Sequence, residues 1–120
     1  MKKVLVFLAL ALIANCSFSQ TFLAEDAAKH IGDSLTICGK IYGGKFLETS
    51  NSAPTFLNMG AAYPNHLLTI FIPLSIRTEL GYAPEILLKD KTVCITGKVI
   101  LYKEKPEIIV YNKAQVEVAK

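Results

Sequence analysis

The stretch from Pro54 to Pro73 constrains the fold of this chain more than any other part of the sequence. The run Thr55–Met59 is apolar or β-favouring, the segment Gly60–Asn65 holds a glycine, a proline and an asparagine, and Leu67–Ile72 is again apolar and β-branched. β-branched and aromatic residues favour strands, whereas Gly, Pro and Asn favour turns. The simplest interpretation is two strands joined by an exposed loop.

The second of these runs has two different faces. Leu68, Ile70 and Ile72 alternate with Thr69 and Phe71. Successive side chains of a strand point to opposite sides of a sheet, so the three aliphatic residues predict a side that faces the core. The other side carries the aromatic ring of Phe71, so we expect both faces of this strand to make contacts.

The same stretch resembles the central segment of a family of secreted bacterial OB-fold, nucleic-acid-binding-like domains. The residues that carry the resemblance are Pro54, the run Thr55-Phe56-Leu57-Asn58, a turn of small residues, Tyr63-Pro64-Asn65, and the apolar strand that follows. The resemblance extends from about Ala27 to Val118. It implies a mainly β fold, a five-stranded Greek-key OB-fold barrel, but no particular activity, because such domains occur both alone and attached to secreted nucleases.

The N-terminus has the pattern of a signal peptide. Lys2 and Lys3 form a positive segment, Val4–Ala14 is an unbroken apolar run, and Ser17–Ser19 offers the small-x-small pattern that signal peptidase reads. We therefore expect residues 1–19 to be a signal peptide, residues 20–120 to be the OB-fold domain, and the protein to be periplasmic or secreted. A membrane anchor would need about 20 apolar residues. Lipidation of Cys16 is the alternative fate of this segment.

Removing the signal changes the interpretation of charge. The chain has 13 Lys plus Arg and 10 Asp plus Glu. Lys2 and Lys3 leave with the signal, so 13 − 2 = 11 basic residues face 10 acidic ones, a net charge of +1. Net charge therefore does not predict a nucleic-acid partner, and any such affinity must come from local clusters.

The rest of the sequence predicts three more strands and two helical regions around that central pair. A short helix is expected over Phe22–Ile31, ended by Gly32, and one or two short helical turns between the third and fourth strands, within Leu74–Asp90. The expected strands are Leu35–Tyr42, Thr55–Met59, Leu67–Ile72, Lys91–Tyr102 and Glu107–Tyr111, with a loop over Gly43–Ala53, a turn over Lys103–Pro106, and Ala114–Val118 extending or returning the fifth strand.

Two cysteines remain after removal of the signal, Cys38 and Cys94. These cysteines lie in the expected strands Leu35–Tyr42 and Lys91–Tyr102. In each of the two strands the aliphatic residues share one face, and the cysteine points to the opposite face. Because the first and fourth strands of an OB barrel are neighbours, we expect these cysteines side by side and candidates for a disulfide in an oxidising compartment. The alternative is two free thiols beneath a helix.

The sequence offers little material for catalysis. His30 and His66 are too few and too far apart in the sequence to suggest a zinc site, and no glycine-rich phosphate loop or nucleophile elbow is present. Nucleases built on an OB barrel need several metal-binding carboxylates and arginines, whereas this chain has one arginine, Arg77. We expect no enzyme activity, no metal and no cofactor.

Material for binding lies on the two loops that flank the ligand face of an OB-fold. One loop region carries Tyr42, Lys45 and Phe46, and the other carries Tyr102, Lys103 and Lys105. Aromatic rings beside lysines suit single-stranded nucleic acid, because bases stack and phosphates pair. Asn58 joins these candidates, since a polar residue in an apolar strand must find partners or face a ligand. The alternative is that the rings pack and the lysines confer solubility.

The function expected from the sequence is an exported, non-catalytic binding module for single-stranded nucleic acid or another polyanion. A protein-interaction module of the cell envelope is one alternative, and it would expose an apolar patch around Tyr82–Leu88. An oligosaccharide-binding module is another, and it would use the aromatic residues without the lysines.

Overall fold

A computed structural model of the chain describes residues 20–119. The expected signal peptide, residues 1–19, and Cys16 within it lie outside the described residues. The described part is mainly β, with seven strands and only short helical segments. In chain order the elements are β1 (Thr21–Leu23), η1 (Ala24–Lys29), β2 (Ser34–Phe46), β3 (Thr55–Met59), β4 (Leu68–Ile72), α2 (Leu74–Leu80), α3 (Pro84–Leu87), β5 (Thr92–Tyr102), β6 (Lys105–Ile109), η2 (Lys113–Gln115) and β7 (Val116–Val118).

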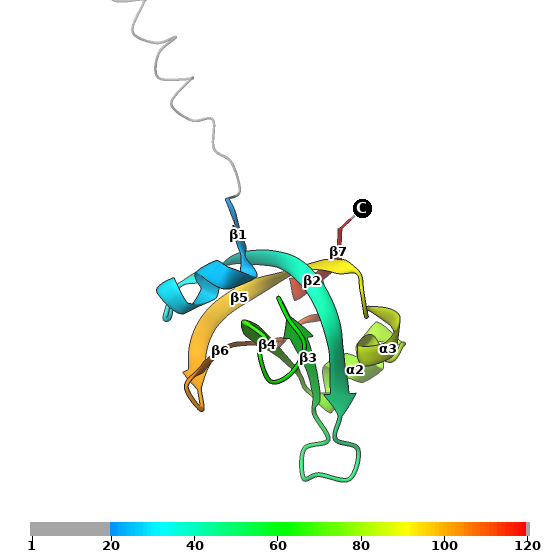
Figure 1. The fold of residues 1–120 in the computed structure, drawn as a ribbon. Coiled ribbons are helices and arrows are strands. Elements are labelled where there is room, and N and C mark those ends of the chain that lie inside the picture. The colour runs from blue at the N-terminus through cyan, green and yellow to red at the C-terminus, as the bar shows by residue number, and fades with distance from the viewer. Residues whose placement is uncertain (1–19, 120) are drawn as a thin grey trace, which may run out of the picture.

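The strand pairings form a circuit. β2 pairs with β3, β3 with β4 and β5 with β6 in antiparallel fashion, β4 pairs with β6 in parallel, and β5 pairs back with β2. The first half of β2 pairs with β5 over Ser34–Lys40, and its second half pairs with β3 over Ile41–Phe46. Figure 1 shows β2 arching across the top of the molecule from one partner to the other.

The core fills the inside of this circuit. The alternation read in the sequence is confirmed, because Leu68, Ile70 and Ile72 are fully buried while Thr69 and Phe71 are on the other face. The faces predicted for the two cysteine-bearing strands are also confirmed. Ile37, Ile41, Val93, Ile95 and Val99 are all completely buried. The buried surface therefore comes from every strand of the circuit, which is why the opposite faces are left for solvent or ligands.

The N-terminal helix expected over Phe22–Ile31 is only partly right. Thr21–Leu23 instead forms β1, which pairs in parallel with Thr36–Cys38, and a 3₁₀ helix follows over Ala24–Lys29. The backbone N–H of Leu23 donates to a carboxylate oxygen of Asp26 at 3.0 Å, and this bond fixes the change from strand to helix. β1 and the C-terminal β7 are three-residue strands, and they raise the strand count to seven.

Among the strands expected from the sequence, β2 and β6 differ most in their bounds from the prediction. β2 continues through the expected loop to Phe46, because a register shift between Ile41 and Gly43 lets it turn and stay paired. Gly43 has φ +139°, a conformation that side chains disfavour, so glycine suits this bulge. At the other end, Lys103 and Glu104 both have positive φ and form a two-residue turn, so β6 begins at Lys105 rather than Glu107.

Between β4 and β5 lie two short helices, as the sequence predicted. Arg77 of α2 donates two hydrogen bonds to Glu85 of α3, at 2.8 and 3.2 Å, and a third to Thr55 of β3. Its guanidinium also lies 3.7 Å from the ring centre of Phe46. The single arginine thus ties both helices to the ends of β2 and β3. Within residues 20–119 no helix is long and apolar enough to cross a membrane.

The disulfide between Cys38 and Cys94 is present, which confirms the sequence prediction. The two residues are register partners in the β2–β5 ladder and are separated by 56 positions in the sequence. The bond therefore fastens the pairing that joins β5 back to β2. A covalent link across so long a loop removes much conformational freedom from the unfolded chain.

We expect the double variant Cys38→Ser/Cys94→Ser to keep the fold and to lose about 4 kcal/mol of unfolding free energy, the chain-entropy value for a loop of this length. Urea unfolding followed by circular dichroism measures the loss. Reductant should destabilise the natural protein by a similar amount and leave the double variant unchanged. Equal stability of the oxidised protein and the variant would contradict this account.

Candidate nucleic-acid interface

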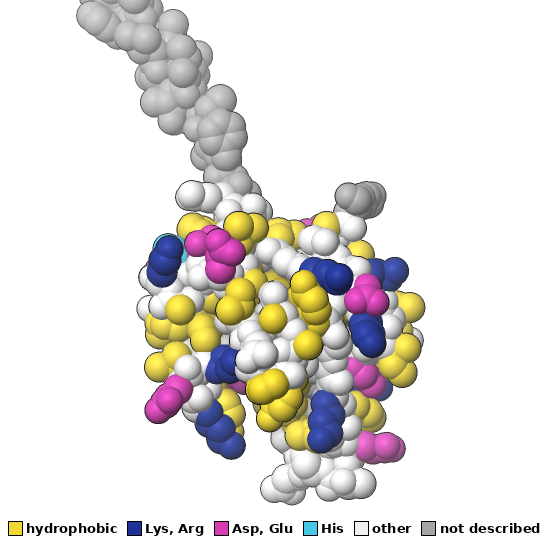
Figure 2. Space-filling view, viewed as in Figure 1, with side chains coloured by type: hydrophobic (Ala, Val, Ile, Leu, Met, Phe, Trp, Pro, Cys, Tyr) yellow, Lys and Arg dark blue, Asp and Glu magenta, His cyan; other side chains and the backbone are white. Residues whose placement is uncertain are grey.

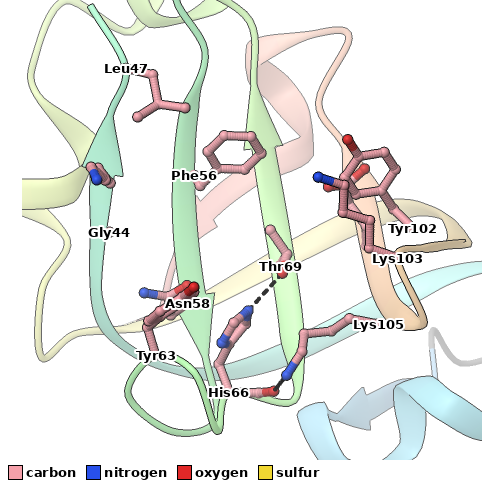
Figure 3. A pocket seen from close by; sticks show the side chains of 12 residues that line it. Gly44, Leu47, Phe56, Asn58, Tyr63, His66, Thr69, Tyr102, Lys103 and Lys105 are labelled. Atoms are coloured by element: carbon pink, nitrogen blue, oxygen red, sulfur yellow. Dashed lines mark hydrogen bonds between the residues drawn. The ribbon is translucent and has the colours of Figure 1, made fainter.

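A groove of about 550 Å³ lies on the side of β3 and β4 opposite the core. It runs between the β2–β3 loop on one side and the β5–β6 turn on the other. In Figure 1 both segments project in the lower half of the view. Figure 3 shows the groove from close by. Its lining residues are Gly44, Lys45, Leu47, Phe56, Asn58, Tyr63, His66, Thr69, Tyr102, Lys103, Lys105 and Glu107.

The register of three strands builds a polar row on the floor of the groove. Thr69 of β4 pairs with Asn58 of β3 on one side and with Glu107 of β6 on the other. Register partners point to the same face of a sheet, with neighbouring strands about 4.8 Å apart. The hydroxyl, the amide and the carboxyl therefore stand side by side in the groove.

Aromatic rings border this polar row. The Phe56 ring lies above Thr69 in Figure 3 and packs edge-on against Phe71, with ring centres 5.3 Å apart. The ring of Tyr63 stacks on that of His66 at 5.7 Å. Tyr102 is half exposed at the opposite rim, next to Lys103. The groove therefore combines ring faces for stacking with polar atoms on the floor.

The side chain of His66 is buried, and its surroundings favour the uncharged imidazole. Its Nε2 is 2.8 Å from the hydroxyl of Thr69, while its Nδ1 is buried and has no hydrogen-bond partner in the described chain. Burial and the positive charge of Lys105 lower the pKa of His66 below its ordinary value. The side chain therefore remains unprotonated at neutral pH. Within residues 20–119 no group of three or more His, Cys, Asp or Glu gathers in a way that could hold a metal ion.

Lys105 holds the β3–β4 loop in place. Its ammonium group donates to the carbonyl oxygens of Pro64 and His66, at 3.0 and 2.9 Å, and Figure 3 shows the bond to His66. Two of its three donors are thus used within the protein. The position of Tyr63 and His66 over the groove depends on this contact between the two loops.

Glu107 is the least expected residue of the floor. Its side chain belongs to the groove lining although the residue is only 4% exposed. Burial raises its pKa above the ordinary value, and no neighbouring charge or hydrogen bond in the described chain offsets that effect. Burial of this carboxylate without a charge partner costs folding free energy, and the side chain faces the groove rather than the core.

Five of the seven ligand-binding residues predicted from the sequence meet in the groove. They are Lys45, Asn58, Tyr102, Lys103 and Lys105. The other two lie elsewhere. Tyr42 falls at the register shift of β2 and lies 4.8 Å beneath the ammonium of Lys40, and Phe46 is covered by Arg77.

The sequence does not predict the remaining lining residues as ligand-binding ones, although the family resemblance falls on Phe56 and Tyr63. The sequence places Thr69 on the outer face of its strand and Tyr63 in the turn-rich segment Gly60–Asn65. Nothing local distinguishes Phe56, His66 or Glu107, because each becomes part of the floor only through the register of β3, β4 and β6. The alternation of Phe56 and Asn58 with buried Leu57 was the one available signal.

The charges around the groove lie at its rims. Lys45 is exposed at the end of β2, and Lys103 is exposed in the β5–β6 turn. In the lower half of Figure 2, Lys or Arg side chains lie on both sides of apolar surface. An extended anion that crosses the groove would therefore meet a cation on either side.

Comparison with known proteins bears on the fold. No protein-family model matches the chain, and no curated protein matches it. Among solved structures, that of yeast Stn1 and Ten1 superposes with a TM-score of 0.58 at 18% identity, covering 87% of this chain and 64% of the matched one. A putative aspartyl-tRNA synthetase from Leishmania major Friedlin superposes with a TM-score of 0.55 at 6% identity, covering 87% and 22%. The chain thus spans less than two thirds of either matched chain, and at these identities the likeness shows the fold alone.

The raised pKa of Glu107 makes a prediction about stability. Between the ordinary value of 4.5 and the raised value, the folded protein binds the proton more tightly than the unfolded chain does, so stability falls as pH rises through that window. Glu107→Gln should therefore raise the melting temperature at pH 7.5, and the gain should shrink towards pH 4. Thermal unfolding at both pH values measures this.

Glu117→Gln is the matched control, because Glu117 is exposed on β7. It should change the melting temperature little at either pH. A loss of stability in Glu107→Gln at pH 7.5 would contradict the unpartnered carboxylate.

Proposed function

We propose that residues 20–119 form an OB-fold domain and that its groove binds single-stranded nucleic acid. The pairing circuit β2–β3–β4–β6–β5 supports the fold, since an OB-fold is a five-stranded Greek-key barrel. In this proposal β1 and β7 are short additions to its edges. The likeness to the solved structures agrees with this fold.

The position of the groove is the observation that supports a nucleic-acid ligand. OB-folds bind oligonucleotides and oligosaccharides across their second and third strands, between the loop that joins strands one and two and the loop that joins four and five. The groove of this protein lies over β3 and β4, between the β2–β3 loop and the β5–β6 turn. Rings on the floor with lysines at both rims are the combination by which single strands are bound.

The side chains divide into two roles. Phe56 and Tyr102 offer faces on which bases stack, and Lys45 and Lys103 pair with phosphates. Lys103 has φ 51°, a left-handed conformation that disfavours residues with a Cβ.

The module acts without catalysis in this proposal. Arg77 donates hydrogen bonds to Glu85. Burial alone would raise the pKa of Glu85, but its hydrogen bonds and the charge of Arg77 hold that pKa below its ordinary value. The arginine is therefore engaged in holding the fold together. His66 is bound to Thr69 and has no nucleophile beside it among the described residues.

We further propose that the domain works outside the cytoplasm, as a member of the secreted bacterial family that its sequence resembles. The Cys38–Cys94 disulfide supports this, because such bonds persist in oxidising compartments.

Protein docking is a second candidate function, and one observation favours it. Ile86 and Leu87 of α3 are 73% and 51% exposed, and Leu74 of α2 is 45% exposed. These residues lie in and near the segment where the sequence analysis placed an apolar patch, although Tyr82 itself packs against the core. They are separate from the groove lining, so the two functions are separable by mutation.

Fluorescence anisotropy of a labelled single-stranded oligonucleotide tests the proposed function. Binding should be saturable, and two phosphate contacts should give a logarithmic salt slope of about −1.4, at about 0.7 for each contact. Lys103→Gly should make that slope shallower by about 0.7, because one phosphate contact is lost. Tyr102→Ala should weaken binding by about 1 to 3 kcal/mol through lost stacking.

Lys103→Gly is a favourable test because glycine suits the left-handed backbone, so the variant should fold at least as stably as the natural protein. Lys89→Gln, an exposed lysine outside the groove, is the matched charge control and should bind normally. Absence of binding at low salt would refute the nucleic-acid proposal. A Tyr102→Ala effect without a Lys103→Gly effect would contradict the proposed phosphate contact of Lys103.

A further inference from the structure

The floor of the groove holds two polar side chains that the protein itself leaves unsatisfied. Glu107 is 4% exposed and His66 is 6% exposed, and both line the groove. The Nδ1 of His66 has no partner, and no hydrogen bond or charge in the described chain offsets the burial of Glu107. The Nδ1 of His66 is the one buried side-chain nitrogen or oxygen atom within residues 20–119 that lacks a partner, whereas the Glu107 carboxylate opens onto the groove without a hydrogen bond to the described chain. Buried polar groups are almost always paired, so the floor suits a ligand that supplies hydrogen bonds there.

The chemistry of the floor defines the kind of ligand atom that fits. An ionised carboxylate accepts hydrogen bonds through two adjacent oxygens and donates none. It repels phosphate, which keeps an anionic backbone away from the floor and near Lys45 and Lys103 at the rims. The part of a nucleotide that reaches Glu107 must therefore be the neutral base, and that base must present N–H groups.

We propose that the groove selects guanine, whose N1–H and N2–H groups donate a pair of hydrogen bonds to the Glu107 carboxylate. This inference rests on the proposed nucleic-acid function and adds a base preference to it. Guanine is the base whose Watson–Crick edge offers two adjacent donors. Cytosine and adenine present a donor beside an acceptor, and thymine or uracil presents one donor between two carbonyls. Only guanine matches two adjacent acceptors.

The surroundings of Glu107 suit a base held edge-on to the floor. Thr69 is the register partner of Glu107 and bonds to His66, so the three polar groups are contiguous. Asn58 extends the row on β3 and offers both a donor and an acceptor. Phe56, which borders the row in Figure 3, provides a ring against which a base can lie. Splayed bases of single strands are commonly read in this way, by stacking together with hydrogen bonds to their edges.

A panel of oligonucleotides tests the preference with the natural protein. Labelled oligothymidylates that carry one central dG, dI, dA, dC or dT are compared by fluorescence anisotropy at pH 7.5. Inosine is guanine without the N2 amino group, so it isolates one of the two hydrogen bonds. A bidentate contact discriminates by roughly ten- to a hundredfold, so the dG oligonucleotide should bind at least about tenfold more tightly than those with dI or dT.

The variant Glu107→Gln, measured with the same panel, provides a second test. The amide offers one acceptor and one donor, so the variant should lose the preference for dG and favour dC or dA instead. It keeps the size of the side chain and removes a buried charge, so it should remain folded, as thermal unfolding will verify. Lys103→Gly is the matched control, and it should weaken binding of the whole panel by the same factor.

The outcomes separate the two proposals. Equal affinity for the dG and dI oligonucleotides, or a dG preference that survives Glu107→Gln, would overturn the guanine inference and leave the nucleic-acid function standing. Failure of every oligonucleotide to bind at low salt would refute the proposed function itself. A dG preference that Glu107→Gln converts into a preference for dC or dA would support both.

Discussion

The structure depends on the pairing of one long strand with two partners. β2 bonds to β5 along its first half and to β3 along its second half, and the register shift before Gly43 gives it the bend that this requires. Without that bend, β3 and β5 could not both remain paired to one strand. The disulfide from Cys38 to Cys94 fastens the half of β2 that closes the circuit with β5, while Arg77 packs against the end of the other half.

The groove follows from the register of the strands in this circuit. Once β3, β4 and β6 are held in register, their core-facing residues are buried, and the alternate residues collect on one outer surface. Thr69, Asn58 and Glu107 come together there although they are far apart in the sequence. The fold tolerates a carboxyl without a charge partner at this point, as expected for a residue that is held there by the register of its strand.

The sequence predicted those features that depend on local pattern. Alternation in Leu68–Ile72 defines the core face, and the segment Leu74–Asp90, which contains Gly81 and Pro84, predicts only short helices between β4 and β5. The sequence failed where a distant contact decides the outcome. β1 exists because β2 offers it an edge, and Phe46 is withdrawn from the groove because Arg77 covers it. Glu107 is no more than the first residue of the fifth strand in the sequence prediction, because only the sheet register reveals that it is buried beside Thr69.

If the groove binds single-stranded nucleic acid as proposed, the hydrogen bonds of Arg77 within the fold affect how the nucleic acid would move. With the only arginine held by Glu85 and Thr55, the free cations of the groove are lysines. An ammonium group is a point charge on a flexible stem, whereas a guanidinium fixes a phosphate in one orientation. A single strand would therefore be attracted without being locked in register. It could slip along the rims nucleotide by nucleotide, so that the floor, rather than the charges, decides where it stops.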